Sequence, residues 1–218
     1  MKKFIKENKS RVIIIVLMFL FETLMYFIAK IFEGTPIYLN NHIDDMIPFI
    51  PYFVIFYFLW YIFLFLIPLL ILKYDKKVFD KYILVSVVYT LLEVIIFILL
   101  PTTMNRADFI VNNMSTFLVD LAYKVDYPVR NLFPSAHCAF ALLFIMATLD
   151  LKKLNIKYKL LIIISSILII LSTVFVKQHV IVDFIGAFCI IVPMYYIIRS
   201  KSINLEKSGI YAKIFCKK

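Results

Sequence analysis

Long apolar segments recur along this 218-residue chain and are separated by short polar ones. Apolar runs of roughly 18 residues or more have the length that a helix needs to cross the ~30 Å hydrocarbon layer of a membrane. The pattern predicts six membrane-spanning helices, over residues 12–32, 52–72, 82–100, 135–150, 159–176 and 180–198. We therefore expect an all-α, polytopic membrane protein, a bundle of six transmembrane helices in a single domain over residues 1–218.

Composition agrees with this expectation. Hydrophobic residues make up 63% of the chain and charged residues 17%, with a mean hydropathy of +0.94. A soluble domain of this size needs more charged residues to cover its surface. Composition therefore argues against a soluble bundle with an apolar core.

Lysine and arginine are unevenly divided between the two sides of the predicted bundle. The N-terminus, the segments 73–81 and 152–159 and the chain from residue 199 hold 19 of the 24 basic residues. The positive-inside rule places these segments in the cytoplasm, so both termini are expected there, with a basic tail over 200–218. Attraction to the anionic lipids of a cell membrane then explains the net charge of +10, and no nucleic-acid partner is expected.

The segment between the third and fourth predicted spans has a different pattern. Over residues 109–124, apolar residues recur at helical spacing, and Asn, Ser, Thr and Asp fill much of the other face. Such a pattern is typical of an amphipathic helix that lies on the membrane surface. We expect this helix on the outer surface, where it either covers a site or only connects two spans.

Two of the three histidines lie in short polar segments, 134–137 and 177–183, on the outer side of the predicted bundle. His179 and Asp183 are four residues apart at a helix start, so they share a face and the carboxylate can orient one imidazole nitrogen. His137 follows a proline and a serine at another helix start, where free backbone N–H groups and the helix dipole favour an anion. An anion between these two helix starts would contact both histidines.

Cationic side chains lie on the same side. Arg106 and Lys177 precede the histidine segments, and arginine matches the geometry of phosphate oxygens. Two histidines, one carboxylate, a serine and two cations are typical of phosphoryl transfer. Asp183 alone offers too little carboxylate for magnesium and His137 has no ligand-spaced partner, so neither a metal nor another cofactor is expected.

The order arginine, Pro-Ser-x-His and His-x3-Asp over the outer ends of the last four spans resembles the type 2 phosphatidic acid phosphatase superfamily, which are integral membrane lipid phosphatases. The similarity is strongest over residues 101–186, and we expect a catalytic core at about 82–199. The resemblance implies that His179 attacks phosphorus and forms a phosphohistidine, and that Asp183 orients and stabilises it. It also implies that His137 protonates the leaving alkoxide and then activates water.

The same resemblance implies a phosphate site without a metal. Ser135 and the backbone N–H groups of Ala136 and His137 would surround the phosphoryl oxygens, and Arg106 would bind them. The chain departs from the family motifs at Leu99, Ala107, Ala136 and Thr173. Because Leu99 and Thr173 stand where the family has a lysine and an arginine, two phosphate cations are missing.

We predict that Lys177 and Arg130 supply the charge that the motifs lack. Lys177 lies two residues before the proposed nucleophile, and Arg130 lies four residues before Pro134. Both are therefore near the two helix starts in sequence.

The threonine at position 173 leaves a second interpretation open. With threonine at position 173, the segment that leads to His179 and Asp183 also resembles the sphingolipid and inositol-phosphoryl transferases of the wider superfamily. These enzymes pass a headgroup to an alcohol. An acceptor alcohol needs a second polar pocket, and the outer loops offer few groups for one beyond Asp44, Asp45, Asn112 and Asn113. The sequence therefore favours hydrolysis of a lipid phosphate or diphosphate monoester, such as phosphatidic acid, phosphatidylglycerol phosphate or a polyprenyl diphosphate.

A third interpretation is a transporter or a non-catalytic membrane protein. Glu22 and Glu93 lie within predicted spans, where carboxylates are costly and often functional. They also fit hydrogen-bonded carboxyls packed between helices near Tyr26 or Tyr89. With three glycines and its polar groups on one face, the chain has little of the broken-helix pattern of transporters.

Overall fold

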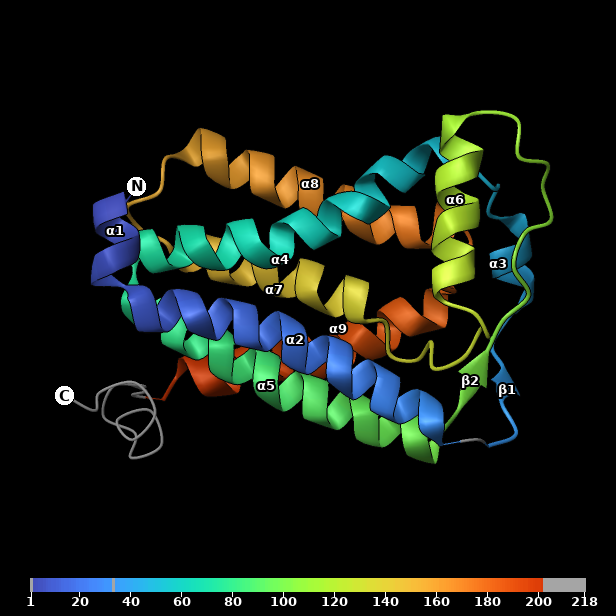
Figure 1. Cartoon of the computed structure of the whole chain (residues 1–218), viewed down its shortest axis with the longest axis horizontal. Helices are drawn as coiled ribbons and strands as arrows, with labels where there is room; N and C mark the ends of the chain where they lie inside the picture. Colours follow the sequence, from blue (N-terminus) through green and yellow to red (C-terminus); the bar gives the residue numbers. More distant parts are fainter. Residues whose placement is uncertain (1, 33, 202–218) are drawn as a thin grey trace.

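A computed structural model of the protein describes residues 2–32 and 34–201. Most of the predicted basic tail, residues 202–218, lies outside the described residues. The helices are α1 (Lys2–Glu7), α2 (Lys9–Ile31), α3 (His42–Met46), the 3-10 helix η1 (Pro51–Phe53), α4 (Val54–Tyr74), α5 (Lys76–Leu99), α6 (Met114–Val125), α7 (Ala136–Asp150), α8 (Ile156–Phe175) and α9 (Ile181–Arg199). The long helices form one bundle, and α6 lies across one end of it (Figure 1).

The predicted class, an all-α polytopic membrane protein, is confirmed, but the count of six spans is not. Five helices in the described ranges are long and apolar enough to cross a membrane: Lys9–Ile31, Pro51–Tyr74, Lys76–Leu99, Ile156–Phe175 and Ile181–Arg199. The fourth predicted span, 135–150, is the apolar helix α7, which has only 15 residues. In Figure 1 its first turn lies well inside the bundle, short of the ends of α2 and α5.

The segment before α7 is not helical because its backbone groups bond elsewhere. Thr102 accepts from the backbone N–H of Asn131 at its carbonyl (2.9 Å), and from those of Leu132 and Phe133 at Oγ1 (2.9 and 3.1 Å). Pro134 also disfavours a helical backbone at the residue before it. Irregular backbone at membrane depth is tolerated where protein buries it, and Leu132 is 2% exposed.

Two predicted boundaries were wrong because of helix caps. The third span begins at Lys76 and not at residue 82, since the Asp75 side chain accepts from the backbone N–H groups of Lys77 (2.8 Å) and Val78 (3.1 Å). The predicted loop 73–81 is therefore reduced to a turn. The amphipathic helix begins at Met114 and not at residue 109, because Asn113 caps it through the Thr116 N–H at 3.0 Å.

A short parallel pair of strands, β1 (Ile37–Tyr38) and β2 (Thr102–Thr103), ties the loop after α2 to the loop after α5. Two residues per strand are too few to produce an alternating pattern, so the sequence did not predict this sheet. The pairing lies at the same end of the bundle as α6 (Figure 1). It brings the segment that leads to Arg106 against the segment that leads to α3.

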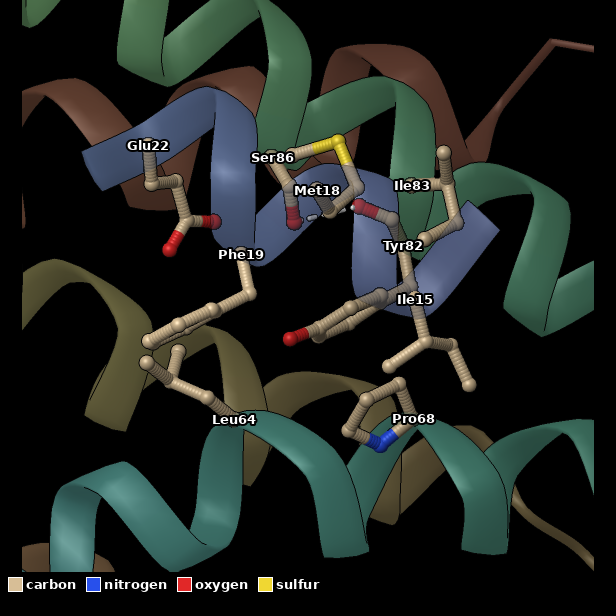
Figure 2. A pocket seen from close by; sticks show the side chains of 9 residues that line it. All are labelled: Ile15, Met18, Phe19, Glu22, Leu64, Pro68, Tyr82, Ile83 and Ser86. Carbon is tan, nitrogen blue, oxygen red and sulfur yellow. Dashed lines mark hydrogen bonds between the residues drawn. The ribbon is translucent and has the colours of Figure 1, made fainter. Parts of the chain in front are cut away.

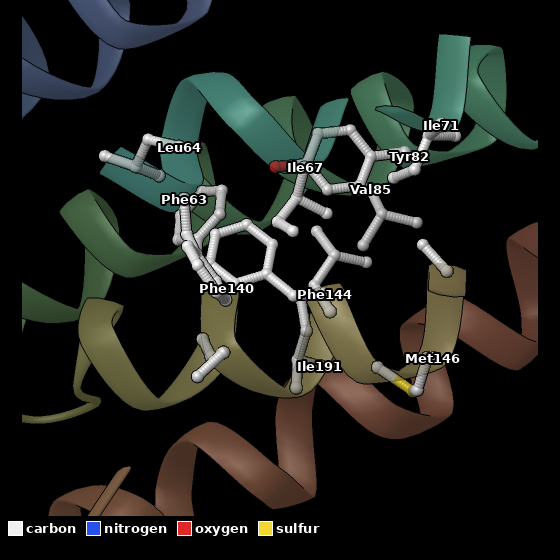
Figure 3. Packing of buried hydrophobic residues seen from close by; sticks show 14 of the residues in the cluster. Phe63, Leu64, Ile67, Ile71, Tyr82, Val85, Phe140, Phe144, Met146 and Ile191 are labelled. Carbon is white, nitrogen blue, oxygen red and sulfur yellow. The ribbon is translucent and has the colours of Figure 1, made fainter. Parts of the chain in front are cut away.

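The core lies between α4, α5, α7 and α9. Figure 3 shows side chains of Phe63 and Ile67 from α4 against Phe140 and Phe144 from α7, with Ile191 of α9 on the other side of α7. Outside this core, large apolar side chains of α2 and α8 are exposed, as is typical of helices that face lipid: Leu17, Leu20, Leu24, Phe27, Leu160, Leu161, Ile164 and Ile167. Since lipid chains are as apolar as leucine, close packing rather than exclusion of water holds such a core together.

At the end of the bundle opposite α6, a buried ion pair joins α2 to α5. Arg11 contacts Asp80 through Nε to Oδ1 at 3.1 Å and through Nη2 to Oδ2 at 3.2 Å. Their side chains are 6% and 3% exposed. Two parallel bonds to one carboxylate fix the relative position of the two helices.

Removing one member of this pair should destabilise the bundle. Asp80→Ala removes the carboxylate that makes two bonds to this buried guanidinium, so we expect a loss of about 3 kcal/mol, measured by unfolding in detergent. The matched control is Asp120→Ala, which breaks the ion pair to Lys124, a side chain that is 72% exposed. That variant should lose less than about 1 kcal/mol, and equal losses would contradict this assignment.

Candidate active site

The starts of α7 and α9 are joined directly. The backbone N–H of Ser135 donates to the carbonyl of Asp183 at 3.3 Å. Gly186, one turn into α9, lies against the ring of Phe133, and a Cβ on Gly186 would be only 2.2 Å from Cε2 of that ring. The segment before α7 thus packs on the first turns of α9 because residue 186 has no side chain.

His179 is oriented by a buried carboxylate, as the sequence predicted from their spacing. His179 Nδ1 lies 3.0 Å from Asp183 Oδ2, and the same oxygen accepts from the backbone N–H of Val180 at 3.1 Å. The Asp183 side chain is fully buried and the His179 side chain is 11% exposed. This bond uses Nδ1 and leaves Nε2 of His179 for a reactant.

His137 lies next to His179, with 5.8 Å between the ring centroids. Its imidazole stacks on Tyr57 at 4.4 Å and on Trp60 at 4.1 Å, both from α4. Nε2 of His137 is buried and has no hydrogen-bond partner among the described residues. The aromatic rings fix the plane of the imidazole, while a nitrogen remains without a partner.

Both histidines line a cavity of about 570 Å³ that reaches into the bundle between α2, α4, α5 and α7. Most of its wall is apolar or aromatic. Polar groups of Asp126, Gln178, His137 and His179 line it beside the two helix starts. Glu22 and Glu93, the two carboxyls within predicted spans, line it as well. The size and the largely apolar wall are typical of a cavity that binds a small molecule.

Arg106 is held by a network beside the histidines. It bonds to a carboxylate oxygen of Asp126, donates to Gln178 Oε1 at 2.6 Å, and lies 4.5 Å from the centroid of the Tyr123 ring. Asp126 also bonds to the hydroxyl of Tyr26. Sequence reasoning found Arg106 but missed Asp126 and Gln178, although Gln178 directly precedes His179 and could have been noticed there.

Tyr123 ties α6 to the loop before α9. Its hydroxyl donates to the carbonyl of Val176 at 2.8 Å, and its backbone carbonyl accepts from Arg106 at 3.1 Å. Burial raises the pKa of Tyr123 to about 12, so the hydroxyl stays protonated and donates near neutral pH. The predicted amphipathic helix therefore contributes groups that hold Arg106.

Ser135 acts as the N-cap of α7. Its Oγ accepts from the backbone N–H of Cys138 at 3.3 Å, and the residue is fully buried. Ala136 and His137, the first two residues of α7, line the cavity. Thr173, at the position where the family has arginine, is also fully buried, and its carbonyl accepts from the backbone N–H groups of Gln178 and His179.

The two predicted replacement cations lie near the site but outside the cavity wall. Lys177 Nζ donates to the carbonyl of Asp44 at 2.7 Å, and the Lys177 backbone has a positive φ of 54°. Asp44 also accepts from the Ile181 N–H at 2.9 Å, so this residue of α3 caps α9 and is not the spare group that the sequence suggested. Arg130 is half-buried in the segment before α7. Like these two cations, Arg106, Ser135 and Asp183 do not themselves line the cavity.

The contact between Gly186 and Phe133 makes a direct prediction. Gly186→Ala forces the ring away and should destabilise the protein by about 1–3 kcal/mol, measured by unfolding in detergent. Adding Phe133→Ala restores the space, so the double variant should be more stable than the sum of the two single losses predicts. Additive losses would show that the two residues do not compete for the same space.

Comparison with known proteins identifies the family of this chain. Searches of curated proteins and of solved structures found no significant match. The family model described as the PAP2 superfamily matches residues 22–197, which include both histidines, Asp183 and Arg106. Membership supports a phosphatase-type enzyme in a membrane. The predicted resemblance is confirmed, and the chain belongs to the PAP2 superfamily.

Proposed function

We propose that this protein hydrolyses a lipid phosphate or diphosphate monoester through a phosphohistidine on His179, without a metal. One observation carries the proposal: His179 is held by a buried carboxylate at 3.0 Å, and it faces His137 at 5.8 Å between ring centroids on the wall of a cavity that fits a lipid. This arrangement supports His179 as the nucleophile, Asp183 as its orienting group and His137 as the acid–base group.

In the first step, Nε2 of His179 attacks phosphorus while the bond from phosphorus to the leaving oxygen breaks. The leaving oxygen takes a proton from His137, whose protonated form the phosphate anion beside it would favour. Asp183 accepts from Nδ1–H of His179 and offsets the positive charge that develops on its ring. The products are a phosphohistidine and the dephosphorylated lipid.

In the second step, water attacks the phosphohistidine. The water gives a proton to His137, its oxygen bonds to phosphorus, and the P–N bond to His179 breaks. Inorganic phosphate leaves, His179 is neutral again, and His137 is protonated for the next cycle. The same histidine therefore serves first as an acid and then as a base.

Several groups would bind the phosphoryl oxygens. The backbone N–H groups of Ala136 and His137 lie at the start of α7, where an anion is favoured. Arg106 would act from beside the cavity, where Asp126 and Gln178 hold its guanidinium. Lys177 and Arg130 would add positive charge from the adjacent segments.

The substrate and the membrane placement follow from the same features. Basic residues concentrate at the end of the bundle away from the histidines, at Lys6, Lys73, Lys152 and Arg199 among others, which supports cytoplasmic termini and an active site on the outer face of the cell membrane. The apolar cavity wall supports a substrate that keeps its chains in the bilayer while its phosphate reaches the histidines. Phosphatidic acid, phosphatidylglycerol phosphate and polyprenyl diphosphates belong to this class.

Transfer of the phosphoryl-bearing headgroup to an alcohol is a second candidate, and one observation favours it. A cavity of about 570 Å³ is far larger than a water nucleophile needs, and Glu22 and Glu93 add polar groups to its wall. The sequence offered few groups in the outer loops for a pocket that binds an acceptor alcohol. This cavity within the bundle is a candidate for that pocket.

The central prediction concerns His179. Purified protein in detergent should release phosphate from a lipid phosphate in the presence of a chelator, and His179→Ala should lower kcat by about 10³-fold or more because the nucleophile is gone. The control is His42→Ala, since His42 is exposed in α3 and its loss should change little. Phosphate release that survives in His179→Ala would contradict the proposal. Headgroup transfer to an added alcohol, with little free phosphate, would favour the transferase.

A separate prediction concerns the replacement cations. Lys177→Ala and Arg130→Ala should raise KM and weaken inhibition by inorganic phosphate, because each removes positive charge beside the phosphate. Lys177→Arg should keep both properties close to those of the unchanged protein. If turnover and phosphate inhibition are unchanged in the alanine variant at either position, that residue does not replace a family cation.

A further inference from the structure

Glu22 and Glu93 lie on the same cavity as the histidines but inside the bundle. They are nine and six residues before the ends of α2 and α5, at the end where the histidines lie, which corresponds to depths of about 13 and 9 Å along the helices. The two carboxyls come from neighbouring helices and line the same cavity. Neither residue has a role in the phosphatase proposal.

The Glu93 carboxyl has an unused oxygen. Glu93 is 7% exposed, and its Oε1 has no hydrogen-bond partner among the described residues. A buried polar atom without a partner costs on the order of 1–3 kcal/mol. Because Glu93 lines the cavity, a ligand in the cavity can supply the partner that the protein does not.

Glu22 lines two cavities of different size. Besides the large cavity, it lines a small pocket of about 10 Å³ together with Tyr82 and Ser86. Figure 2 shows the Glu22 carboxyl beside this pocket, with the hydroxyl of Tyr82 pointing into it. Such a volume holds about one water molecule, so Glu22 can be hydrated from one side and face a ligand on the other.

The chemistry of this region favours an uncharged hydrogen-bonding group. Two carboxyls disfavour a phosphate, so the anion belongs at the histidines. Trp60 lines the same cavity, and its Nε1–H, which can only donate, has no partner among the described residues. A hydroxyl group both donates and accepts, so it can bond to a carboxyl oxygen or to an indole N–H. Any group that binds at this depth must lose its water, and the free-energy cost of this is higher for a cationic headgroup than for a hydroxyl.

We propose that Glu93 and Glu22 form a second binding site in the cavity, which hydrogen-bonds a hydroxyl group of a lipid while the phosphate lies at His179. The proposal rests on the proposed function for the position of the phosphate. The hydroxyl belongs either to the backbone of the phosphate lipid itself or to a separate lipid alcohol in the same cavity. Both sources present the same group to Glu93.

Trp60 provides a direct test, because it is the only tryptophan in the sequence and lines the cavity. Protein in lipid nanodiscs is titrated while its tryptophan fluorescence is followed. Four ligands are compared: a single-chain glycerol phosphate with a free backbone hydroxyl, its deoxy analogue, a long-chain alcohol and the matching hydrocarbon. The first pair tests a hydroxyl on the phosphate lipid, and the second pair tests a separate alcohol.

In at least one pair, we expect the compound with the hydroxyl to bind about tenfold more tightly than the compound without it. This ratio corresponds to a difference in binding free energy of about 1.4 kcal/mol. Glu93→Leu should remove this preference, because the side chain no longer bonds to the hydroxyl, and Glu22→Leu should reduce it. Glu93→Gln should keep most of it, since an amide still donates and accepts. The control Glu7→Leu, at an exposed carboxyl at the end of α1, should bind like the unchanged protein.

Equal affinities within both pairs in the unchanged protein would overturn the proposal, even if Glu93→Leu does not fold. A preference that persists in a folded Glu93→Leu would overturn it as well. A different result would assign the site to a cation instead. In that case the protein would show no hydroxyl preference, and it would bind a long-chain ammonium in a way that is lost in Glu93→Gln. These results are separate from phosphate release: failure of the proposed function appears as absent turnover or as activity in His179→Ala, whereas this site is read from binding alone.

Discussion

The buried carboxylate of Asp183 is the constraint on which the site depends. It lies at the first turn of α9 in an apolar bundle, where an unpaired charge would be strongly unfavourable. Oδ2 accepts from the backbone of Val180 and contacts Nδ1 of His179, and the main-chain carbonyl of Asp183 accepts from Ser135. One residue thereby caps α9, sets the orientation of His179 and fixes the start of α7 beside it. The geometry of the histidine pair follows from the bonds that this one residue makes.

Irregular segments carry the rest of the positioning. Thr102 accepts three backbone N–H groups of the segment before α7, so this segment reaches into the bundle without forming a helix. Asp44 caps α9 from the first loop and its carbonyl binds Lys177. Because these segments satisfy their own backbone groups within the protein, α7 can begin below the ends of its neighbours. A short α7 therefore creates the depth at which His137 lies.

The charged groups around the site are engaged with one another. Arg106 is shared between Asp126 and Gln178 and stacks on Tyr123, so α6 is part of the site's support. In the cavity, Asp126 and Gln178 lie beside the histidines with Arg106 bonded behind them, while Glu22 and Glu93 line its wall deeper in the bundle. This arrangement supports the two proposed binding positions, an anion at the histidines and a neutral group deeper in the cavity. It links the proposed phosphatase chemistry to recognition of the lipid.

The sequence by itself determined the class of the fold and the residues of the histidine site. Apolar runs of membrane length produced the helices, and the His-x3-Asp spacing predicted the bond between His179 and Asp183 because residues four apart share a helix face. Only the tertiary structure decided that α7 is too short to count as a sixth span, that Asp126 and Gln178 hold Arg106, and that Glu22 and Glu93 share a cavity with the histidines. These features depend on contacts between residues far apart in the sequence, such as Tyr26 and Asp126, which are 100 positions apart. They also depend on caps and loop bonds that leave no periodic pattern in the sequence.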